Sequence, residues 1–492
     1  MPCKKTELVP VGEVRISCSK SVGGLSPVGC WCQLLWPAAL HPDTCIQQLR
    51  LITAIVVSFL TSTLIEAPMV QTLKQLFRRL GPGLITGAAD DDPSGIATYS
   101  QAGSQFRFGL IWTLLVTTPL MIGIQMLSAR IGWVTGEGLA ANIDKMCPRW
   151  LTTLLVGLLV VANTINIAAD IGAMGEAMRL LAGGQQTLYV MGFGALCIAT
   201  QLFFSYERTV RVLKWLTAAL FAYVAVIVSV AVPWRQVLSE SMHPWSFFPA
   251  NTSLKDYTSM VVAVLGTTIS PYLFFWQASQ EVEDSFRRPD AQALKSDPKN
   301  AARHLSRIKI DTFFGMTLSN VIALCIVIAT AVTLNLRGVT NIQTAAQAAE
   351  ALKPVAGDFA FVIFALGIIG TGLLAVPVLA GSAAYAVSEL YGWRSGLSRG
   401  FRQAKGFYMI IIIATGIGTL MGYFELDPIK ALVWSAIVNG VISVPIMVVL
   451  MCIGQSRKLM GQYTISMRHR FFGWSATLVM AAAVALMFLT SI

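Results

Sequence analysis

Three consecutive carboxylates interrupt an apolar stretch near residue 90. The sequence AADDDPSG (88–95) places Asp90, Asp91 and Asp92 directly before Pro93, within a segment otherwise apolar enough to cross a membrane. Proline removes a backbone donor and clashes with the preceding turn, so we expect an interrupted helix with freed carbonyls. A carboxylate and bare carbonyls at membrane depth are costly unless they line a cavity or bind an ion. We therefore predict that Asp92 binds a cation.

The other two acids are assigned weaker roles. We expect Asp91 to act on the cation through water and Asp90 to line the pathway. The alternative is that both lie at an aqueous rim, where Asp90 is only a surface charge, and that Pro93 alone is inside the membrane.

A second apolar segment carries a matching interruption. Residues 260–284 are apolar on both flanks, and their centre holds Gly266, Thr267, Thr268, Ser270 and Pro271. Hydroxyls and the carbonyls freed by the proline are further oxygen ligands for a cation. A proline kink with no ligand role is the alternative, and the presence of the first interruption argues against it.

The composition indicates where these segments lie. Of 492 residues, 55% are hydrophobic and 12% charged, with a mean hydropathy of +0.65, which is far more apolar than a soluble domain. The net charge of +11 comes from short basic clusters between apolar segments, as in membrane-protein loops, and not from a nucleic-acid-binding patch. We expect an all-α, multi-pass integral membrane protein whose partner is the lipid bilayer and not nucleic acid; no feature fixes an oligomeric state.

Apolar runs of membrane-spanning length predict about eleven transmembrane helices. They cover 83–105, 109–131, 150–173, 186–204, 212–233, 258–277, 310–334, 357–385, 406–424, 429–453 and 471–491. Lys and Arg are concentrated in alternate loops, including 286–309, 393–405 and 455–470, and such loops face the cytoplasm. The N-terminus is then cytoplasmic and the C-terminus outside, in a bacterial-type inner or plasma membrane.

The two interrupted helices are the first and the sixth predicted spans. Matching breaks in the first helix of each half are typical of five-plus-five inverted repeats of the LeuT type, with the substrate at the midplane between the breaks. We therefore predict one transporter domain over 69–492, with repeats at about 81–233 and 258–453 and an extra helix at 471–491.

The first 68 residues do not fit this pattern. They hold five of the nine cysteines (Cys3, Cys18, Cys30, Cys32 and Cys45) and one moderately apolar run, at 51–66. Met69 then begins a short basic, amphipathic segment of the kind that starts a membrane protein. We expect 1–68 to be a disordered extension or upstream sequence outside the native chain; a twelfth span is the alternative.

At the two interruptions the chain resembles the Nramp family of divalent-metal transporters. That family has Asp-Pro-Gly-Asn after Gly-Pro-Gly in helix 1, where this chain has Gly81-Pro82-Gly83 and Asp92-Pro93-Ser94-Gly95; it has Met-Pro-His-Asn in helix 6, where this chain has Ser270-Pro271-Tyr272-Leu273. The resemblance implies metal ligands at Asp92, Gly95, Ser270 and the carbonyl of Thr267.

The departures from the family pattern indicate which metal is carried. Ser270 replaces the family's thioether, and Gly95 replaces its amide ligand. Oxygen ligands suit Mg²⁺ and Mn²⁺, whereas sulfur favours softer metals. Mg²⁺ keeps several waters and uses one or two carboxylates. The pattern resembles the Nramp-related magnesium transporters, so we expect alternating-access transport of partly hydrated Mg²⁺, and of Mn²⁺, in a pocket widened at Gly95.

Proton coupling is not expected. Aligned on Gly172, Asn166 and Ala169 stand where the family has helix 3 acids tied to proton movement, and Tyr272 stands where it has a histidine. Asp170 remains on helix 3, either as a substitute acid or as a polar residue near the outer mouth. We therefore list Asp90, Thr268, Tyr272, Asn166 and Asp170 as pathway residues.

Other functions remain as alternatives. A proton-coupled Mn²⁺ or Fe²⁺ importer is the first, and an organic-solute carrier of the same fold is the second, although three carboxylates do not suit an anionic substrate. An enzyme is not expected, because no spacing of Ser, His, Cys or paired acids within the spans indicates nucleophilic or metal-cluster chemistry. No cofactor is expected, and the metal ion is the substrate.

Overall fold

The computed structural model describes two units of the chain separately, Met1–Leu76 and Phe77–Ile492. The described residues are 8–11, 14–17, 82–203, 218–242, 253–287, 294, 301–423 and 428–491. In the first unit, β1 (Leu8–Val11) and β2 (Val14–Ser17) form an antiparallel pair with Leu8 opposite Ser17. Met69, the N-terminal cysteines and the rest of 1–68 lie outside the described residues, so the expectation for that extension stays a prediction.

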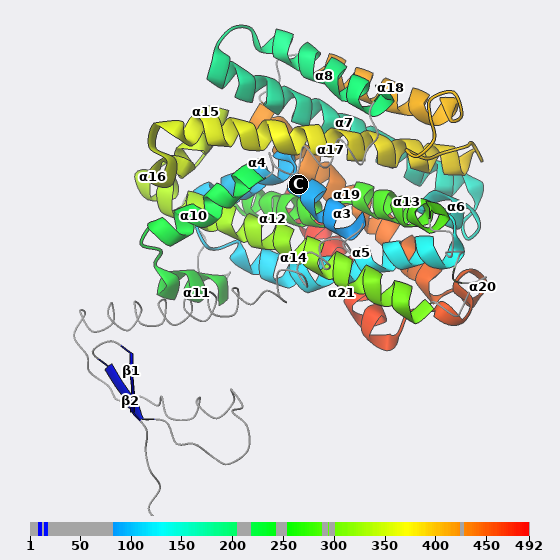
Figure 1. The fold of residues 1–492 in the computed structure, drawn as a ribbon, viewed down its shortest axis with the longest axis horizontal. Helices are drawn as coiled ribbons and strands as arrows, with labels where there is room; N and C mark the ends of the chain where they lie inside the picture. Colours follow the sequence, from blue (N-terminus) through cyan, green and yellow to red (C-terminus); the bar gives the residue numbers. More distant parts are fainter. Residues whose placement is uncertain are drawn as a thin grey trace, which may run out of the picture. The chain divides into compact units, whose positions relative to one another are not determined.

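The second unit is built from helices alone in its described parts (Figure 1). The first half contains α3 (Pro82–Asp90), α4 (Pro93–Phe106), α5 (Ile111–Thr135), α6 (Leu139–Asp144), α7 (Arg149–Ala182), α8 (Gln186–Phe203), η2 (Ala218–Leu220), α10 (Phe221–Ser229) and α11 (Trp234–Met242). The second half contains α12 (Leu254–Thr268), α13 (Pro271–Arg287), α14 (Ala301–Thr333), η5 (Asn335–Arg337), α15 (Ala345–Ala349), η6 (Glu350–Leu352), α16 (Lys353–Ala356), η7 (Gly357–Phe359), α17 (Ala360–Leu390), α18 (Lys405–Tyr423) and α19 (Pro428–Gln455). The chain then continues through α20 (Arg457–Met460), η8 (Gly461–Tyr463) and α21 (Met467–Ser491).

Each predicted span corresponds to a helix or a broken helix pair. Nine helices of the described chain are long and apolar enough to cross a membrane, or ten if the bent pair Ala218–Ser229 and Trp234–Met242 is one span. The α12/α13 pair is counted among them as one span, Leu254–Phe286, and the α3/α4 pair is not among them. Of the predicted span 212–233, the structure describes residues 218–233. After this span, α11 turns away from α10 by 109°.

The two broken helices are made in the same way. In each, a proline is the first residue of the second half, Pro93 in α4 and Pro271 in α13. Proline favours that position because it has no N–H to leave unbonded. Asp91 and Asp92 separate α3 from α4, and Ile269 and Ser270 separate α12 from α13. The predicted interruptions of helices 1 and 6 are therefore present.

The packing of the two halves is reciprocal. Helix α14, the second span of the second half, packs on α3 and α4, and α5, the second span of the first half, packs on α12 and α13. The third spans, α7 and α17, pack on each other. The fourth spans, α8 and α18, pack on each other and on both α7 and α17. Figure 1 shows α3, α4 and α12 enclosed by the other helices. This exchange of partners is what an inverted repeat requires.

Small residues let α14 approach the broken helix closely. A Cβ on Gly87 would lie 2.3 Å from the Gly315 carbonyl oxygen, and one on Gly103 would lie 2.2 Å from that of Val327. Backbones at this distance exclude any side chain, as is common where membrane helices cross. Both halves of the broken helix are thus fixed against α14.

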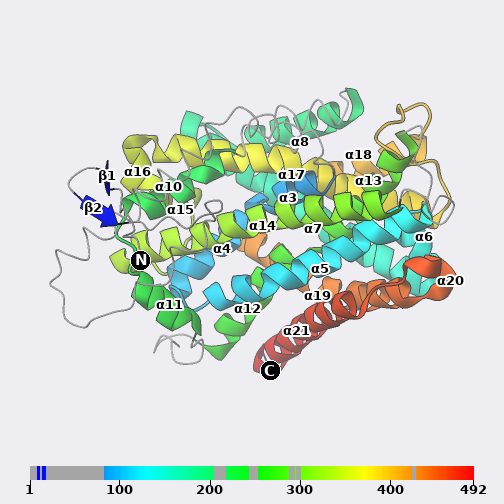
Figure 2. The ribbon, with the colours of Figure 1, turned by 60° about the horizontal axis from the view of Figure 1, so that its bottom comes forward.

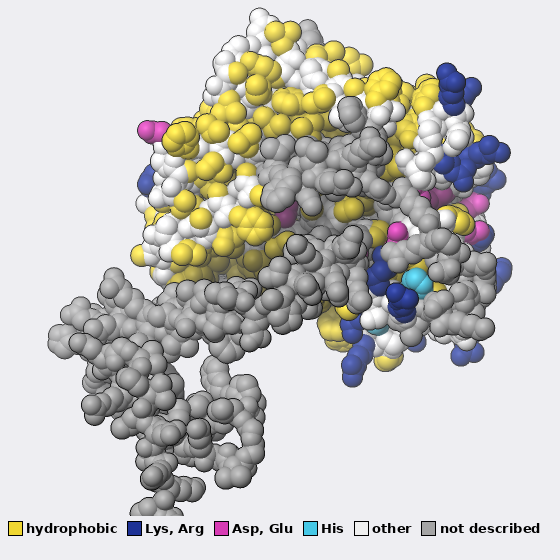
Figure 3. All heavy atoms as spheres, in the orientation of Figure 1, with side chains coloured by type: hydrophobic (Ala, Val, Ile, Leu, Met, Phe, Trp, Pro, Cys, Tyr) yellow, Lys and Arg dark blue, Asp and Glu magenta, His cyan; other side chains and the backbone are white. Residues whose placement is uncertain are grey.

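The surface of the second unit divides by residue type. Large apolar side chains are exposed along the long helices, among them Leu154, Leu188, Leu420 and Leu489. Figure 2 shows α21 along the outside of the bundle, beside α5 and α19. Figure 3 shows Lys and Arg side chains gathered toward the end of the bundle where α6 and α20 lie. An apolar belt with a basic end suits a helical bundle in a bilayer.

At that basic end, Glu283 of α13 holds the loop 391–404 between α17 and α18. Its carboxylate accepts hydrogen bonds from the Leu397 amide (2.7 Å), the Ser398 amide (3.3 Å) and the Tyr385 hydroxyl. A polar cavity of about 480 Å³ lies beside these groups. Helix α13, the second half of this broken helix, is therefore attached by hydrogen bonds to the loop 391–404.

Candidate cation site at the two helix interruptions

Asp92 is the residue on which the site is built. It is the N-cap of α4, with φ −71° and ψ 171°, and its Oδ1 accepts hydrogen bonds from the Gly95 amide (2.7 Å) and the Ser94 hydroxyl (2.6 Å). An N-cap carboxylate satisfies amides that a helix start leaves unbonded and faces the positive end of the helix dipole. The carboxylate is buried, and its position is fixed by α4 itself.

The second oxygen of Asp92 connects three further helices. Asp92 Oδ2 accepts a hydrogen bond from Asn166 Nδ2 of α7 (3.2 Å) and one from the Tyr272 hydroxyl of α13 (3.3 Å). Asn166 Oδ1 in turn accepts from Ser435 of α19 (2.7 Å), and the Tyr272 hydroxyl also lies 3.2 Å from the Ala89 carbonyl oxygen. Three predicted residues, Asp92, Asn166 and Tyr272, thus meet at one carboxylate.

Asp90 and Asp91 are held together by one residue of α14. The Ser319 hydroxyl lies 2.7 Å from Asp90 Oδ2 and 3.0 Å from Asp91 Oδ1, so it is shared between the two carboxylates. All three aspartates are at most 4% exposed. The alternative that Asp90 is only a rim charge is therefore wrong, because α14 covers it.

At the second interruption, the hydroxyls of Ser270 and Thr268 already form hydrogen bonds with carbonyls of α12, which was not expected. The Ser270 hydroxyl donates to the carbonyls of Gly266 (2.8 Å) and Thr267 (2.9 Å), and the Thr268 hydroxyl donates to its own helix at Val264 (2.9 Å). Ser270 therefore caps the end of α12. A hydroxyl that donates its proton still has lone pairs to offer a cation, so Ser270 Oγ and the second lone pair of the Thr267 carbonyl remain available.

The space predicted beside Gly95 is not found. A Cβ at this position would lie 3.3 Å from the Asp90 carbonyl oxygen, from Thr267 Oγ1 and from Tyr99 Cε2. The expectation of a pocket widened at Gly95 is thus wrong for this conformation. Its physical reason is that the missing side chain lets α4 and α12 approach each other, and Thr267 and Tyr99 fill the volume.

Asp170 lies on α7, one helical turn beyond Asn166. It is fully buried, and neither carboxylate oxygen has a hydrogen-bond partner among the described residues. Its electrostatic neighbours are the Asp92 carboxylate and the backbone amide of Ser94. The alternative of a polar residue at the outer mouth does not fit, because Asp170 is enclosed beside the start of α4.

The chemistry of the assembled groups is that of oxygen. In the described chain, no group of three or more His, Cys, Asp or Glu side chains is arranged to hold a metal. A cation here would have one or two carboxylates, neutral oxygens and water as ligands, a set that suits hard ions. One buried thioether, Met174, packs against Gly372 close to Pro93.

Two residues of this network, Ser319 and Ser435, were not predicted. Each is one of two serines in a long helix, and nothing in its spacing points toward Asp91 or Asn166. The only available signal was the polar residue itself within a membrane span, since such residues tend to face the bundle interior.

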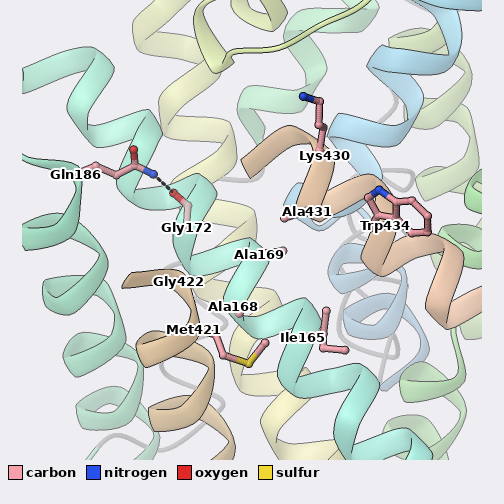
Figure 4. Close-up of a pocket in the computed structure, with 10 residues that line it drawn as sticks. All are labelled: Ile165, Ala168, Ala169, Gly172, Gln186, Met421, Gly422, Lys430, Ala431 and Trp434. Atoms are coloured by element: carbon pink, nitrogen blue, oxygen red, sulfur yellow. Dashed lines mark hydrogen bonds between the residues drawn. The ribbon is translucent and has the colours of Figure 1, made fainter. Parts of the chain in front are cut away.

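A cavity lies beside the candidate cation site and is separate from it. It has a volume of about 450 Å³ and lies between α7, α8, α18 and α19 (Figure 4). Its walls are mainly apolar, with Lys430 and Gln186 among the lining residues, and it contains none of the predicted site residues. We assign the site to the helix interruptions and not to this cavity.

Comparison with known proteins supplies independent evidence. The family described as "Natural resistance-associated macrophage protein-like" (Nramp) matches residues 83–490. The chain is 27% identical over 435 residues to "Divalent metal cation transporter MntH" of Caldanaerobacter subterraneus subsp. tengcongensis, covering 85% of this chain and 94% of that protein. It is 24% identical over 392 residues to the protein of the same name from Aeromonas hydrophila subsp. hydrophila, covering 78% and 88%.

Solved structures share the fold. The Eremococcus coleocola manganese transporter, in complex with an aromatic bis-isothiourea substituted compound, superposes with a TM-score of 0.64 at 18% identity, covering 85% of this chain and 87% of that one. Mhp1, a nucleobase-cation-symport-1 family transporter, superposes with a TM-score of 0.51 at 13% identity, covering 84% and 93%. With the matching interruptions, these likenesses confirm the predicted all-α inverted-repeat fold.

Proposed function

The chain belongs to the Nramp family, and from that premise we propose that it carries hard divalent cations, Mg²⁺ and Mn²⁺, across a membrane by alternating access. The metal is its transported substrate. The protein works without a cofactor and is not an enzyme.

The observation that carries the proposal is the environment of Asp92. Its buried carboxylate lies at the interruption of one helix and accepts a hydrogen bond from Tyr272, which stands two residues past the interruption of another. At that second interruption, the Ser270 hydroxyl and the Thr267 carbonyl are further oxygen atoms. Carboxylate, hydroxyl and carbonyl oxygens favour Mg²⁺ and Mn²⁺ over softer metals. Because few of these groups are charged, the ion keeps part of its water, as Mg²⁺ does in most protein sites.

Manganese is supported by the relatives, and magnesium by the ligands. The relatives are named as divalent metal cation transporters, and one structural neighbour as a manganese transporter. The replacement of a thioether by Ser270 is the reason to include Mg²⁺, and it supports a resemblance to the Nramp-related magnesium transporters.

We further propose that transport is not coupled to protons. The site presents an amide at Asn166 and a phenol at Tyr272, neither of which exchanges a proton readily near neutral pH. The two histidines within the described chain lie elsewhere: His304 stacks on Trp133, and His469 bonds Ser466. A histidine is the side chain best suited to carry protons in this pH range.

A proton-coupled importer of transition metals is the second candidate, and one observation favours it. Met174 places a buried thioether near Pro93, and sulfur would favour Fe²⁺ or Cd²⁺. The thioether packs on Gly372, so we assign it to helix packing. An organic-solute carrier is the third candidate, supported only by the fold shared with Mhp1.

The orientation is part of the proposal. The basic end of the bundle is cytoplasmic, the C-terminus lies outside, and the membrane is a bacterial-type plasma membrane. In this orientation α7 runs from the cytoplasm, at Arg149, to the outer face.

Uptake into proteoliposomes tests the proposal. We expect wild-type protein to take up Mg²⁺ and Mn²⁺ without acidifying the vesicles. Asp92→Ala should reduce uptake to that of protein-free vesicles, and Ser270→Met should shift preference toward Cd²⁺ by supplying a thioether. Met174→Leu is the matched control and should leave the order of preference unchanged. Mg²⁺ uptake by Asp92→Ala at the wild-type rate, or one proton moved per cation, would contradict the proposal.

A further inference from the structure

One buried carboxylate beside the site has no hydrogen-bond partner among the described residues, although the backbone amide of Ser94 lies near it. Asp92 has four hydrogen-bond donors, whereas neither oxygen of Asp170 has a partner in the described part of the chain. Asp170 is 0% exposed. A buried charge without a partner is costly, and such groups in membrane spans usually pair with an ion or lie on its path.

The position of Asp170 relates it directly to Asp92. It follows Asn166 by four residues on α7, so the two side chains lie on one face of the helix, about 6 Å apart along its axis. Asn166 bonds Asp92 Oδ2, and Asp170 lies near the Ser94 amide in the first turn of α4. Asp170 is therefore one turn from Asp92 toward the C-terminal end of α7.

Polar groups continue between α4 and α7 in the same direction. A cavity of about 10 Å³ lies at the next turn; its lining is mainly apolar, with Ser100 and Glu176 as the polar residues. Its volume is about the least that holds one water molecule. Past it, Gln101 Oε1 accepts from the Ile342 amide (2.9 Å) and Glu176 Oε1 from the Ala345 amide (3.1 Å). The segment 342–345 thus covers the end of this polar line.

We infer that Asp170 is a second cation site, on the outer side of Asp92, where an arriving hydrated Mg²⁺ or Mn²⁺ first meets a carboxylate. The inference rests on the proposed function. The two acids act in sequence: Asp170 attracts the ion between α4 and α7, and the ion passes one turn deeper to Asp92. The segment 342–345 must move for the ion to enter, because the cavity beneath it admits no more than one water.

This role differs from that of a structural polar residue. An aspartate kept for packing would have donors of its own, as Glu283 has at the other end of the bundle. The Asp170 carboxylate instead offers both oxygens, and a divalent cation uses such a group fully.

Uptake kinetics of full-length variants test the inference. We expect Asp170→Asn to raise the KM for Mn²⁺ and Mg²⁺ about tenfold or more, the effect of removing a charged oxygen from a polar contact, with kcat little changed. Glu240→Gln, which makes the same change at a buried carboxylate of α11, should leave KM unchanged. An unaltered KM in Asp170→Asn would overturn the inference.

Calorimetric titration with Mn²⁺ separates this inference from the proposed function. Asp92→Ala should retain weak Mn²⁺ binding, and the double variant Asp92→Ala/Asp170→Asn should bind none. If Asp92→Ala alone binds no Mn²⁺, the second site is refuted while the first stands; if wild-type protein neither binds nor transports a divalent cation, the proposed function fails. Should Asp170→Asn fold poorly, Asp170→Ser replaces it in both measurements, with the same outcomes.

Discussion

At the scale of single residues, the site depends on how the hydrogen bonds of Asp92 are divided. Oδ1 is used by its own helix, and Oδ2 receives Asn166 and Tyr272 from two others. A cation that binds Asp92 must therefore use the remaining lone pairs of Oδ2 or displace one of these donors. The groups that orient Asn166 and Tyr272 thus influence binding without touching the ion.

Ser435 is the clearest of these orienting residues. Its hydroxyl donates to Asn166 Oδ1, which turns the amide so that Nδ2 faces Asp92. We expect Ser435→Ala to cost about 1 kcal/mol, the net value of one hydrogen bond, and so to change the KM for Mn²⁺ about fivefold. Uptake kinetics measure this.

The control for Ser435 lies on the same helix. Among the described residues, the Ser443 hydroxyl hydrogen-bonds the Gly440 carbonyl of α19 itself and no residue of the site, so Ser443→Ala should leave KM unchanged. If both variants behave like wild type, the orientation of Asn166 does not matter to binding.

The sequence predicted several of the residues that the structure brings together at Asp92, but not Ser319 or Ser435, and not the distances between them. Asp92 was predicted from its charge next to Pro93. Asn166 and Tyr272 were predicted from their alignment with the Nramp sequence pattern. The prediction for Gly95 was wrong, because a missing side chain leaves space only if the neighbouring helix stands off, and here Thr267 of α12 lies close to Gly95. That proximity depends on packing across helices, which no local pattern encodes.

At the scale of helices, α13 is held at both ends by different means. Its start carries Pro271 and Tyr272 at the site, and its inner end carries Glu283, which bonds the loop 391–404. Any motion that opens the site toward the cytoplasm must act on this second attachment. The loop has three exposed arginines (Arg394, Arg399 and Arg402) where trypsin would cut once it is released.

Removing the attachment should therefore expose the loop. We expect Glu283→Ala to accelerate tryptic cleavage within 391–404 about tenfold or more, since hydrogen bonds worth roughly 1 kcal/mol each hold it closed. Gel analysis of timed digests measures the rate. Asp284→Asn, which alters the neighbouring residue that pairs with Arg307, should digest like wild type; equal rates for both variants and wild type would show that Glu283 does not restrain the loop.

Spans were predicted more accurately than their bends. Long apolar runs predicted both ends of α19 to within two residues, and the start of α7 and the end of α14 to within one. The end of α7 and the start of α14 each extend nine residues beyond the predicted span, because a helix can continue past the apolar run that crosses the membrane. The turn of 109° between α10 and α11 was not predicted, although Pro233 stands just before α11. One proline permits either a kink or a full turn, and packing decides between them.

At the scale of the molecule, the distribution of charge is the strongest indicator of orientation. Lys and Arg gather at one end of the bundle (Figure 3), and the resulting topology has an odd number of spans. We expect a tag placed after Ile492 to react with an impermeant reagent in intact cells.

A tag in the loop 391–404 is the matched control and should react only after the cells are permeabilised. A C-terminal tag that is protected in intact cells would reverse the topology, and with it the assignment of Asp170 to the outer side of Asp92.

Asp92 has two roles, as the N-cap of α4 and as the proposed cation ligand, and this combination limits how the sequence can evolve. One carboxylate both begins α4 and faces the ion, so almost any replacement harms folding and transport at once. Asn166 carries no such double burden, because it can become an acid without removing the cap of α4. Metal preference can therefore diverge among descendants through the surrounding positions, while the aspartate at the centre stays the same.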